Sequence, residues 1–198
     1  MDFDSFSRDG MYDRYLNNIK TNSNSIVFDL GSYKGSSLLR LASKCQGTIY
    51  GFEPIPLFYE EALRIISHEQ RIRIFNCAVS DTDGQMTLHM NHDETSITKT
   101  SGQPIQCQVR SFVTIWKHLG IQTLDVLHMN IEGGEYDVIR NIMKHDLLKH
   151  IKTLVIQFHY PSEETRSFRS MFHAELLKTH TCVYDYAFVW ERWSLREE

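Results

Sequence analysis

Two short apolar runs, each containing an acid and followed by a turn, constrain the fold of this chain more than any other feature. The first, at residues 26 to 37, reads Ile-Val-Phe-Asp-Leu-Gly-Ser-Tyr-Lys-Gly-Ser-Ser: it carries Asp29, turns at Gly31 and opens a helix after Gly35. The second, at residues 49 to 54, reads Ile-Tyr-Gly-Phe-Glu-Pro and carries Glu53. Glycine adopts backbone conformations closed to other residues, and a helix start presents free amide groups. The pattern predicts a strand, a ligand-binding loop, a helix and a second strand.

The spacing of the glycines indicates the kind of ligand. The loop reads Gly-x-x-x-Gly, whereas a loop that cradles a dinucleotide pyrophosphate reads Gly-x-Gly-x-x-Gly, so a nicotinamide or flavin cofactor is disfavoured. We expect Asp29 to face a ligand with positive charge, and Gly31 to let the backbone approach it. S-adenosylmethionine is cationic and has no phosphates, so it fits better. Ordinary turn chemistry is the alternative for this loop.

Glu53 lies 24 positions after Asp29, where the acid of a strand-helix-strand unit accepts hydrogen bonds from the two ribose hydroxyls of a nucleoside. Pro54 suits the exit because it ends the strand and presets the next turn. Taken alone, Glu53 would equally be a solvated acid at a strand end. The glycine loop upstream favours ribose binding.

Composition and charge place the chain among single-domain globular proteins. With 198 residues, 41% of them hydrophobic, it is long enough for one sizeable core. The net charge of −4 and the lack of any run of lysines and arginines give no support to a nucleic-acid groove. The four cysteines form no Cys-x-x-Cys pair, which favours free thiols in a reducing compartment over structural zinc. No signal peptide or membrane span is apparent, so we expect a cytoplasmic protein.

Apolar runs that alternate with helical patterns from residue 26 onward predict an α/β fold in which helices cover both faces of a parallel sheet. Further strands are expected at residues 72 to 75, 124 to 129 and 151 to 158, with a hairpin-like stretch around residues 83 to 89 and an antiparallel closing pair within residues 182 to 195. Residues 91 to 107 are polar and are predicted to form a loop over the sheet edge. Residues 1 to 25 are predicted to form a helical segment that packs on the domain of residues 26 to 198, with a flap over the ligand as the alternative.

Residues suited to ligand binding gather where the predicted strands end, which is the ligand-binding edge of an open α/β sheet. The turn after the third strand contains Ala78 and Val79, and its backbone is suited to the edge of an adenine, although a plain turn explains it equally. The buried fourth strand is followed by Asn130 and Glu132, which alternation places on one side of the chain, with His128 deeper on that side.

Two more titratable residues belong to this edge. Glu135 opens the helix after the fourth strand, and we favour for it the role of a first-turn acid that complements the helix dipole. His159 stands at the end of the fifth strand, where a rim histidine bonded to backbone carbonyls is the alternative to a functional one. Methyl transfer to an oxygen requires removal of the acceptor proton, and Glu132 and His159 are the candidate bases.

With these residues in hand, the chain resembles the FkbM-type family of S-adenosylmethionine-dependent methyltransferases, which are class I in fold. The resemblance runs from about residue 26 to 160. It rests on Val-Phe-Asp-Leu-Gly-Ser-Tyr-Lys-Gly at 27 to 35, Gly-Phe-Glu-Pro-Ile-Pro at 51 to 56, Ala-Val-Ser-Asp at 78 to 81 with Gly84, Thr-Ser-Ile at 95 to 97, Leu-Asp-Val-Leu-His-Met-Asn-Ile-Glu-Gly-Gly-Glu at 124 to 135, and Gln-Phe-His at 157 to 159.

The resemblance implies a doubly wound, mostly parallel seven-stranded sheet with an antiparallel last strand, S-adenosylmethionine as cofactor with S-adenosylhomocysteine as product, and O-methylation, often of a sugar hydroxyl. Catalysis is assigned to Glu132, His159 and Asn130. Cofactor contacts are expected from Asp29, Gly31, Ser32, Gly35, Glu53, Pro54, Ala78, Val79 and Asn130.

Two departures from the family pattern concern metal binding. Where relatives have Lys-x-Asp before Ile-Glu-Gly, this chain has His128 and Asn130, and the usual acid before the rim histidine is Gln157. Divalent Mg²⁺ and Ca²⁺ favour anionic oxygens, so we predict an enzyme without a metal. Asn130 remains suited to hydrogen bond an acceptor or the methionine end of the cofactor.

Three functions compete on this evidence. The leading one is O-methylation of a small molecule or sugar. Methylation of RNA ribose shares the fold, but the scattered basic residues, such as Arg71, Arg73 and Arg110, form no basic groove. A catalytically silent protein that binds cofactor or a partner is the third, motivated by Asn130 and Gln157. The expected partner is a small acceptor rather than nucleic acid or membrane, and a homodimer that completes the acceptor pocket is considered.

Overall fold

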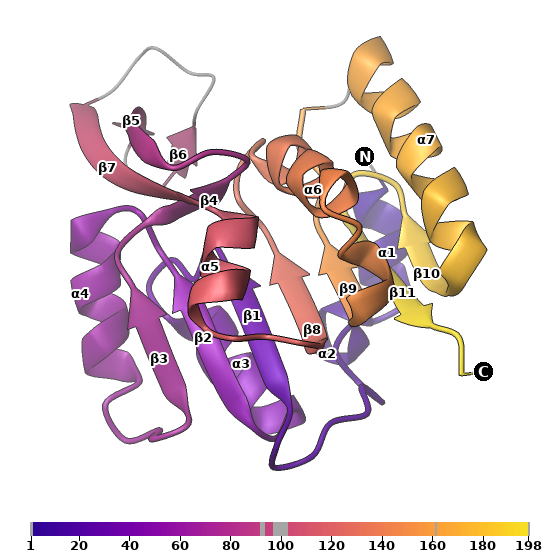
Figure 1. Ribbon diagram of the computed structural model, residues 1–198, viewed down its shortest axis with the longest axis horizontal. Coiled ribbons are helices and arrows are strands. Elements are labelled where there is room, and N and C mark those ends of the chain that lie inside the picture. The colour runs from indigo at the N-terminus through magenta and orange to yellow at the C-terminus, as the bar shows by residue number, and fades with distance from the viewer. Residues whose placement is uncertain (1, 92–93, 97–102, 161, 198) are drawn as a thin grey trace.

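Seven strands form a central sheet with the order β10-β11-β9-β8-β1-β2-β3 (Figure 1). The computed structural model describes residues 2–91, 94–96, 103–160 and 162–197. The strands of this sheet are β1 (Ile26–Leu30), β2 (Thr48–Phe52), β3 (Ile72–Phe75), β8 (Leu124–Met129), β9 (Ile151–Ile156), β10 (His180–Tyr186) and β11 (Trp190–Leu195). Within this sheet the neighbouring strands β3, β2, β1, β8 and β9 pair in parallel. Strand β11 runs antiparallel to both its neighbours, β9 and β10. This confirms the expected sheet, although β9 ends two residues before Phe158.

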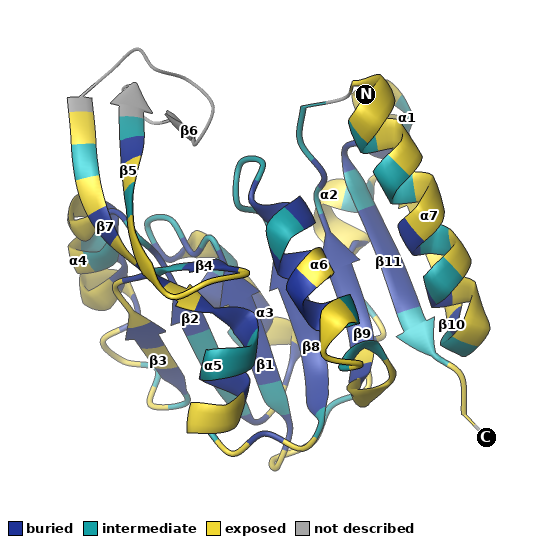
Figure 2. Ribbon diagram, turned by 45° about the horizontal axis from the view of Figure 1, so that its top comes forward, coloured by how far each residue is buried: buried dark blue, intermediate teal, exposed yellow. Residues whose placement is uncertain are grey.

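Helices cover both faces of the sheet because strand residues alternate between two apolar faces. On β1, Phe28 packs in a cluster with α5 (Phe112–His118), α6 (Glu135–Lys144) and α7 (Glu163–Thr179). Its neighbour Val27 belongs to the opposite cluster, with α3 (Ser36–Lys44) and the α4 helix (Pro56–Ile65). Figure 2 shows the middle strands β1, β8 and β9 almost entirely buried, with exposed residues on the outward faces of the helices. The result is a three-layer α/β domain.

A second sheet stands beside the ligand-binding edge and corrects the sequence prediction. Its strands are β4 (Ala78–Ser80), β5 (Gly84–Asn91), β6 (Glu94–Ser96) and β7 (Gln103–Ser111), in the order β4-β7-β5-β6. The predicted loop at residues 91 to 107 is therefore wrong in its described parts, while residues 92–93 and 97–102 lie outside the description. The predicted hairpin is also wrong, because β4 and β5 each pair with β7 and not with one another.

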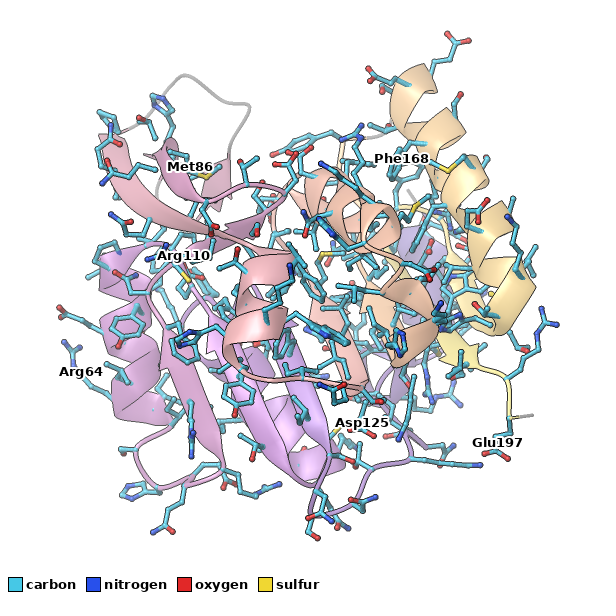
Figure 3. The ribbon with its side chains drawn as sticks, in the orientation of Figure 1. Arg64, Met86, Arg110, Asp125, Phe168 and Glu197 are labelled. Carbon is cyan, nitrogen blue, oxygen red and sulfur yellow. The ribbon has the colours of Figure 1, made fainter. Side chains whose placement is uncertain are left out.

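The local reason for β7 is a strict alternation of side chains. Cys107 and Val109 are buried, whereas Gln106, Gln108 and Arg110 are exposed. Half of the strand is polar because it faces solvent, which made it resemble a loop in the sequence. Figure 3 shows Met86 and Arg110 on this sheet, which projects beyond the central one.

The N-terminal segment contains two short helices, α1 (Phe3–Arg8) and α2 (Met11–Arg14), and packs on the α3 side of the central sheet. Phe6, Tyr15 and Leu16 are buried there. The segment is tied to the C-terminal strands, since the Tyr184 hydroxyl donates to the Tyr15 carbonyl at 2.9 Å. None of the helices in the described part of the chain has the length and apolar character that crossing a bilayer requires.

Candidate active site

A cavity of about 330 Å³ lies beyond the carboxyl ends of β1, β2 and β8. The strand order of the sheet reverses at β1, which has β2 on one side and β8 on the other. Open α/β sheets bind ligands at such switch points. Six of the nine residues expected to contact cofactor line this cavity: Gly31, Glu53, Pro54, Ala78, Val79 and Asn130. Met86 and Leu88 of β5 supply an apolar wall, so the second sheet helps to enclose the site.

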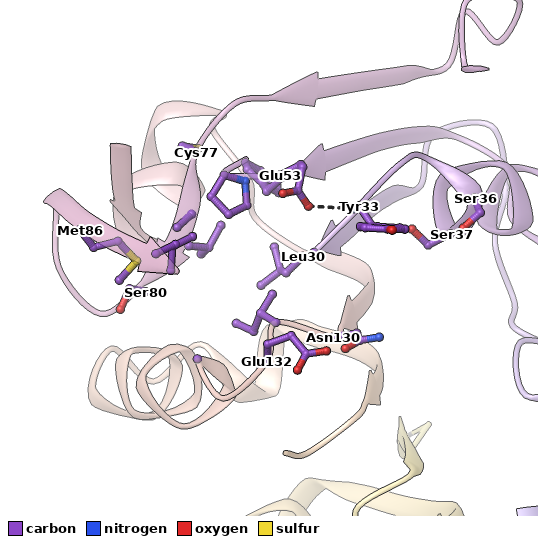
Figure 4. A pocket seen from close by; sticks show the side chains of 18 residues that line it. Leu30, Tyr33, Ser36, Ser37, Glu53, Cys77, Ser80, Met86, Asn130 and Glu132 are labelled. Carbon is purple, nitrogen blue, oxygen red and sulfur yellow. Dashed lines mark hydrogen bonds between the residues drawn. The ribbon is translucent and has the colours of Figure 1, made fainter. Parts of the chain in front are cut away.

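Glu53 is held rigidly at the end of β2. Its carboxylate accepts a hydrogen bond from the backbone N–H of Tyr33 at 2.8 Å (Figure 4) and, on its other oxygen, one from the backbone N–H of Ile55 at 2.9 Å. The residue is 4% exposed, and burial raises the pKa of its carboxyl to about 7, against the lowering effect of those two hydrogen bonds. Each oxygen retains a lone pair, so the carboxylate is suited to two hydroxyl donors on adjacent carbons.

Gly31 is required for a reason that the sequence did not reveal. Its φ is +84°, and a Cβ there would lie 1.9 Å from the backbone oxygen of Asn130. The glycine therefore lets the loop after β1 contact the loop after β8, rather than only clearing space for a ligand. The two loops that line the cavity are thus joined backbone to backbone.

Asp29, Ser32 and Gly35 lie behind the cavity and are not among the residues that line it. The fully buried Asp29 carboxylate accepts a hydrogen bond from the Ser37 hydroxyl at 2.7 Å and lies 2.7 Å from Nδ1 of His128. The structure thus differs from the expectation that Asp29 faces the ligand. Its link to the cavity is Ser37, which does line it. Ser32 is fully buried, and Gly35 precedes α3 with a φ of +93°.

His128 sits beneath the N-terminal segment instead of beside Asn130. Its ring stacks on Trp190, with centroids 4.9 Å apart, and lies near Tyr15. Nε2 is buried without a hydrogen-bond partner among the described residues. His128 therefore serves as the buried partner of Asp29.

Asn130 provides a direct test of whether the cavity fits S-adenosylmethionine. Its Oδ1 is buried and has no hydrogen-bond partner among the described residues, which ordinarily costs about 1–3 kcal/mol. Figure 4 shows Asn130 and Glu132 on the side of the cavity opposite Glu53, with Leu30 between. The cavity thus offers paired carboxylate oxygens on one side and an unsatisfied amide oxygen on the other. This set fits a ligand with ribose hydroxyls at one end and an ammonium group at the other.

Glu132 and His159 are brought together at the rim of the cavity. Glu132 lines it and has a φ of +52°, a conformation uncommon for residues other than glycine and frequent at functional sites. Nε2 of His159 lies 3.5 Å from Oε1 of Glu132, although His159 is not itself among the lining residues. The two candidate bases therefore form one cluster, with Glu132 nearer the cavity.

Glu135 completes this cluster and was missed as a site residue in the sequence. It is fully buried, and its Oε1 lies 2.8 Å from Nδ1 of His159. Burial by itself lowers the pKa of His159, but the hydrogen bond to Glu135 and the charges of Glu135 and Glu132 outweigh it and raise that pKa above 6.5. The sequence signal was two acids around a Gly-Gly turn after a buried strand, yet only the fold shows that His159 faces them.

The charges around the cavity are acidic. Glu53 and Glu132 are its charged lining residues, and no lysine or arginine of the described chain lines it. A cationic ligand is favoured there over a phosphate-rich one.

One group of metal-type ligands occurs among the described residues, away from the cavity, between α7 and the strands β10 and β11. The ligand atoms of His173, Asp185 and Glu191 are within 4.8 Å of one another. Arg169 already forms ion pairs with both acids, with its Nε 2.7 Å from Glu191, so this group needs no cation. The absence of a metal from the reaction stays a prediction.

The chain is similar to the 2-O-methyltransferase NoeI of Sinorhizobium fredii (strain NBRC 101917 / NGR234), with 24% identity over 137 residues that cover 58% of this chain and 56% of NoeI. The chain thus spans little more than half the length of this relative.

Solved structures share the fold at low identity. One is SMU.1697c, a candidate methyltransferase of Streptococcus mutans in complex with S-adenosylhomocysteine, with a TM-score of 0.60, 11% identity, and coverage of 95% of this chain and 97% of that one. Another is an rRNA methylase of Streptococcus thermophilus, with a TM-score of 0.57, 10% identity, and coverage of 94% and 95%. Identities this low show the fold alone.

The sequence pattern of the methyltransferase FkbM domain matches residues 29–186, a span that includes the end of β1, the loops around the cavity and the Glu132, Glu135 and His159 cluster. The chain therefore belongs to the FkbM family of S-adenosylmethionine-dependent methyltransferases.

Proposed function

We propose that the protein transfers the methyl group of S-adenosylmethionine to a hydroxyl oxygen of an uncharged, sugar-like acceptor. The observation that carries this proposal is the imidazole of His159 beside Glu132 at the rim of a cavity whose lining residues include no lysine or arginine among the described residues. The name of NoeI, a 2-O-methyltransferase, supports oxygen as the atom methylated.

When bound, S-adenosylmethionine would supply a methyl group on a positively charged sulfur, which would keep the electron pair of the carbon–sulfur bond as the acceptor oxygen bonds to the methyl carbon. A hydroxyl becomes a good nucleophile only as its proton leaves. Nε2 of His159 accepts that proton, and the adjacent Glu132 carboxylate stabilises the imidazolium formed. The imidazolium then returns the proton to water.

Glu53 and Asn130 bind and orient the cofactor in this account. Glu53, held by the Tyr33 amide, would accept hydrogen bonds from the ribose hydroxyls, and the unpartnered Oδ1 of Asn130 would accept one from the ammonium of the methionine end. Met86 and Leu88 exclude water from the apolar wall. Holding the two reactants together would lower the barrier, because the reaction then resembles a unimolecular step.

The cavity disfavours an RNA acceptor. Binding an RNA backbone relies on lysine and arginine contacts to phosphates, whereas Glu53 and Glu132 are the charges presented here. The similarity to an rRNA methylase is at the level of the fold.

An acceptor screen tests the proposal. The purified protein is incubated with methyl-labelled S-adenosylmethionine and either neutral oligosaccharides, aminosugars, peptides or RNA oligonucleotides, and products are identified by mass and by the linkage of the methyl group. We expect O-methylated neutral saccharide, and loss of product in His159→Gln with cofactor binding retained. Methylation of RNA alone, or of nitrogen alone, would contradict the proposal. Cofactor binding without turnover of any acceptor would favour a catalytically silent protein.

A further inference from the structure

Glu135 has a more elaborate environment than a helix-dipole acid needs. Besides lying 2.8 Å from Nδ1 of His159, its carboxylate accepts hydrogen bonds from the backbone N–H of Ile131 at 2.9 Å and of Gly133 at 3.0 Å. Three donors therefore converge on one fully buried carboxylate. The same contacts fix the loop that carries Glu132.

We propose that Glu135 is a positioning residue that holds His159 with Nδ1 protonated, so that the lone pair of Nε2 is directed at the cavity rim to take the acceptor proton. This inference rests on the proposed function, since it concerns the base of that reaction.

The geometry selects one tautomer of the imidazole. A carboxylate is an acceptor only, so the ring nitrogen 2.8 Å from it must carry a hydrogen. A neutral imidazole carries one hydrogen, and the shorter contact, 2.8 Å from Nδ1 to Glu135 against 3.5 Å from Nε2 to Glu132, places it on Nδ1 and leaves Nε2 as the acceptor. Nε2 lies on the Glu132 side of the ring, 3.5 Å from Oε1 of Glu132, and Glu132 lines the cavity. Nε2 thus faces the place from which an acceptor approaches.

The backbone of His159 is also held in place. The Tyr136 hydroxyl donates to the carbonyl oxygen of His159 at 2.6 Å, so α6 contacts this residue at two points through consecutive side chains. Such a pairing of a buried acid with histidine is the arrangement by which hydrolases orient a catalytic imidazole and stabilise its protonated form.

Asp137 allows a comparison within the same helix. It is also a first-turn acid of α6, but it is about half exposed and pairs with Arg140 at 2.8 Å. An acid that only complements the helix dipole can stay exposed, as Asp137 does, because the dipole also stabilises a solvated carboxylate. The burial and the histidine contact of Glu135 need another explanation.

The charged and titratable groups that face His159 determine how Glu135→Gln changes the pKa and the tautomer of its imidazole. They are Glu135 and Tyr136 from α6, Glu132 from the preceding loop, and the adjacent Tyr160. Glu135→Gln removes the closest of the negative charges that raise the pKa of His159. It also allows either tautomer, because an amide both donates and accepts. The pKa of His159 should therefore fall, and Nε2 should no longer be held as the acceptor.

The experiment combines a spectroscopic and a kinetic readout. In protein labelled with ¹⁵N-histidine, long-range ¹H–¹⁵N spectra report the tautomer and titration of His159, assigned with His159→Gln; the wild type alone tests the tautomer, whatever the stability of the variants. The pH dependence of kcat for the acceptor found in the screen is then measured for the wild type, Glu135→Gln and the control Asp137→Asn. Calorimetric titration with S-adenosylhomocysteine verifies that each variant retains the cofactor site.

In the neutral ring of the wild type we expect Nδ1 to be protonated and Nε2 to be unprotonated. Activity should rise with pH as the imidazolium form of His159 loses the proton on Nε2. In Glu135→Gln, kcat should fall at least about tenfold, and its acidic limb should shift to lower pH together with the His159 titration. Asp137→Asn should change neither. An Nε2-protonated tautomer in the wild type, or an unmoved limb in Glu135→Gln, would overturn the proposal. The expected tautomer with no acceptor methylated at all would overturn the proposed function instead.

Discussion

Glu53 makes cofactor affinity dependent on pH in the neutral range. Hydrogen bonds from ribose hydroxyls are strongest to the ionised carboxylate, whereas burial raises the pKa of this carboxyl to about 7 in the ligand-free protein. The fraction of protein ready to bind is then about one half at pH 7, about nine tenths at pH 8 and about one tenth at pH 6. We therefore expect the dissociation constant to rise about tenfold from pH 8 to pH 6.

The assay is calorimetric titration with S-adenosylhomocysteine across this range, with Glu53→Gln as the control. The amide side chain of this variant does not titrate, and its affinity should be weaker by about 10- to 100-fold at pH 8, the loss of one or two charge-assisted hydrogen bonds. Its affinity should also be nearly independent of pH. Wild-type affinity that stays constant between pH 6 and pH 8, or a variant that keeps the full pH dependence, would refute the role of Glu53.

The raised pKa of Glu53 also predicts how the free energy of unfolding varies with pH. The pKa of Glu53 is raised above its ordinary 4.5, so the ligand-free folded protein holds a proton between pH 4.5 and about 7 that the unfolded chain has released. Its contribution favours folding at low pH and is lost as the pH rises through that window, by up to ~3 kcal/mol. Urea unfolding of wild type and Glu53→Gln at several pH values isolates this contribution by difference.

Three further predictions concern the loops and the chemistry. Gly31→Ala should abolish cofactor binding and lower the melting temperature, because its Cβ would meet the Asn130 oxygen at 1.9 Å at a φ of +84°; unchanged binding in calorimetry and an unchanged melting curve would contradict that contact. His128→Leu should cost about 3–5 kcal/mol in urea unfolding by leaving the buried Asp29 with Ser37 but without its histidine partner, and Asp29→Asn in the same chain should restore part of it; additive losses would argue against the pair. Activity should persist in EDTA, and a loss restored by added Mg²⁺ would show that a metal is needed.

The sequence predicted the central sheet well because its strands are buried on both faces and their apolar runs are unambiguous. It failed at β7, where alternation with exposed Gln106, Gln108 and Arg110 made the strand look like a loop. The pairing partners of these strands were equally hidden. In the sheet β7 lies between β4 and β5, and no local sequence pattern indicates which strands of a sheet are neighbours.

The candidate site was predictable where a residue's place follows from its position at a strand end. Glu53 and Asn130 are examples, and both line the cavity. Residues whose neighbours come from distant segments were not predictable. Asp29 lies against His128, 99 positions away, and Glu135 against His159, 24 positions away, so burial rather than spacing decides what each acid does.

The most direct test of the central claim is calorimetric titration with S-adenosylmethionine of the wild type and of a variant, Ala78→Trp, that fills the cavity. Asp137→Asn and NAD serve as the protein and ligand controls. Micromolar binding of S-adenosylmethionine that is lost in Ala78→Trp and retained in Asp137→Asn is the predicted result. No binding to the wild type, equal binding to Ala78→Trp, or equal binding of NAD would contradict the assignment of this cavity to the cofactor.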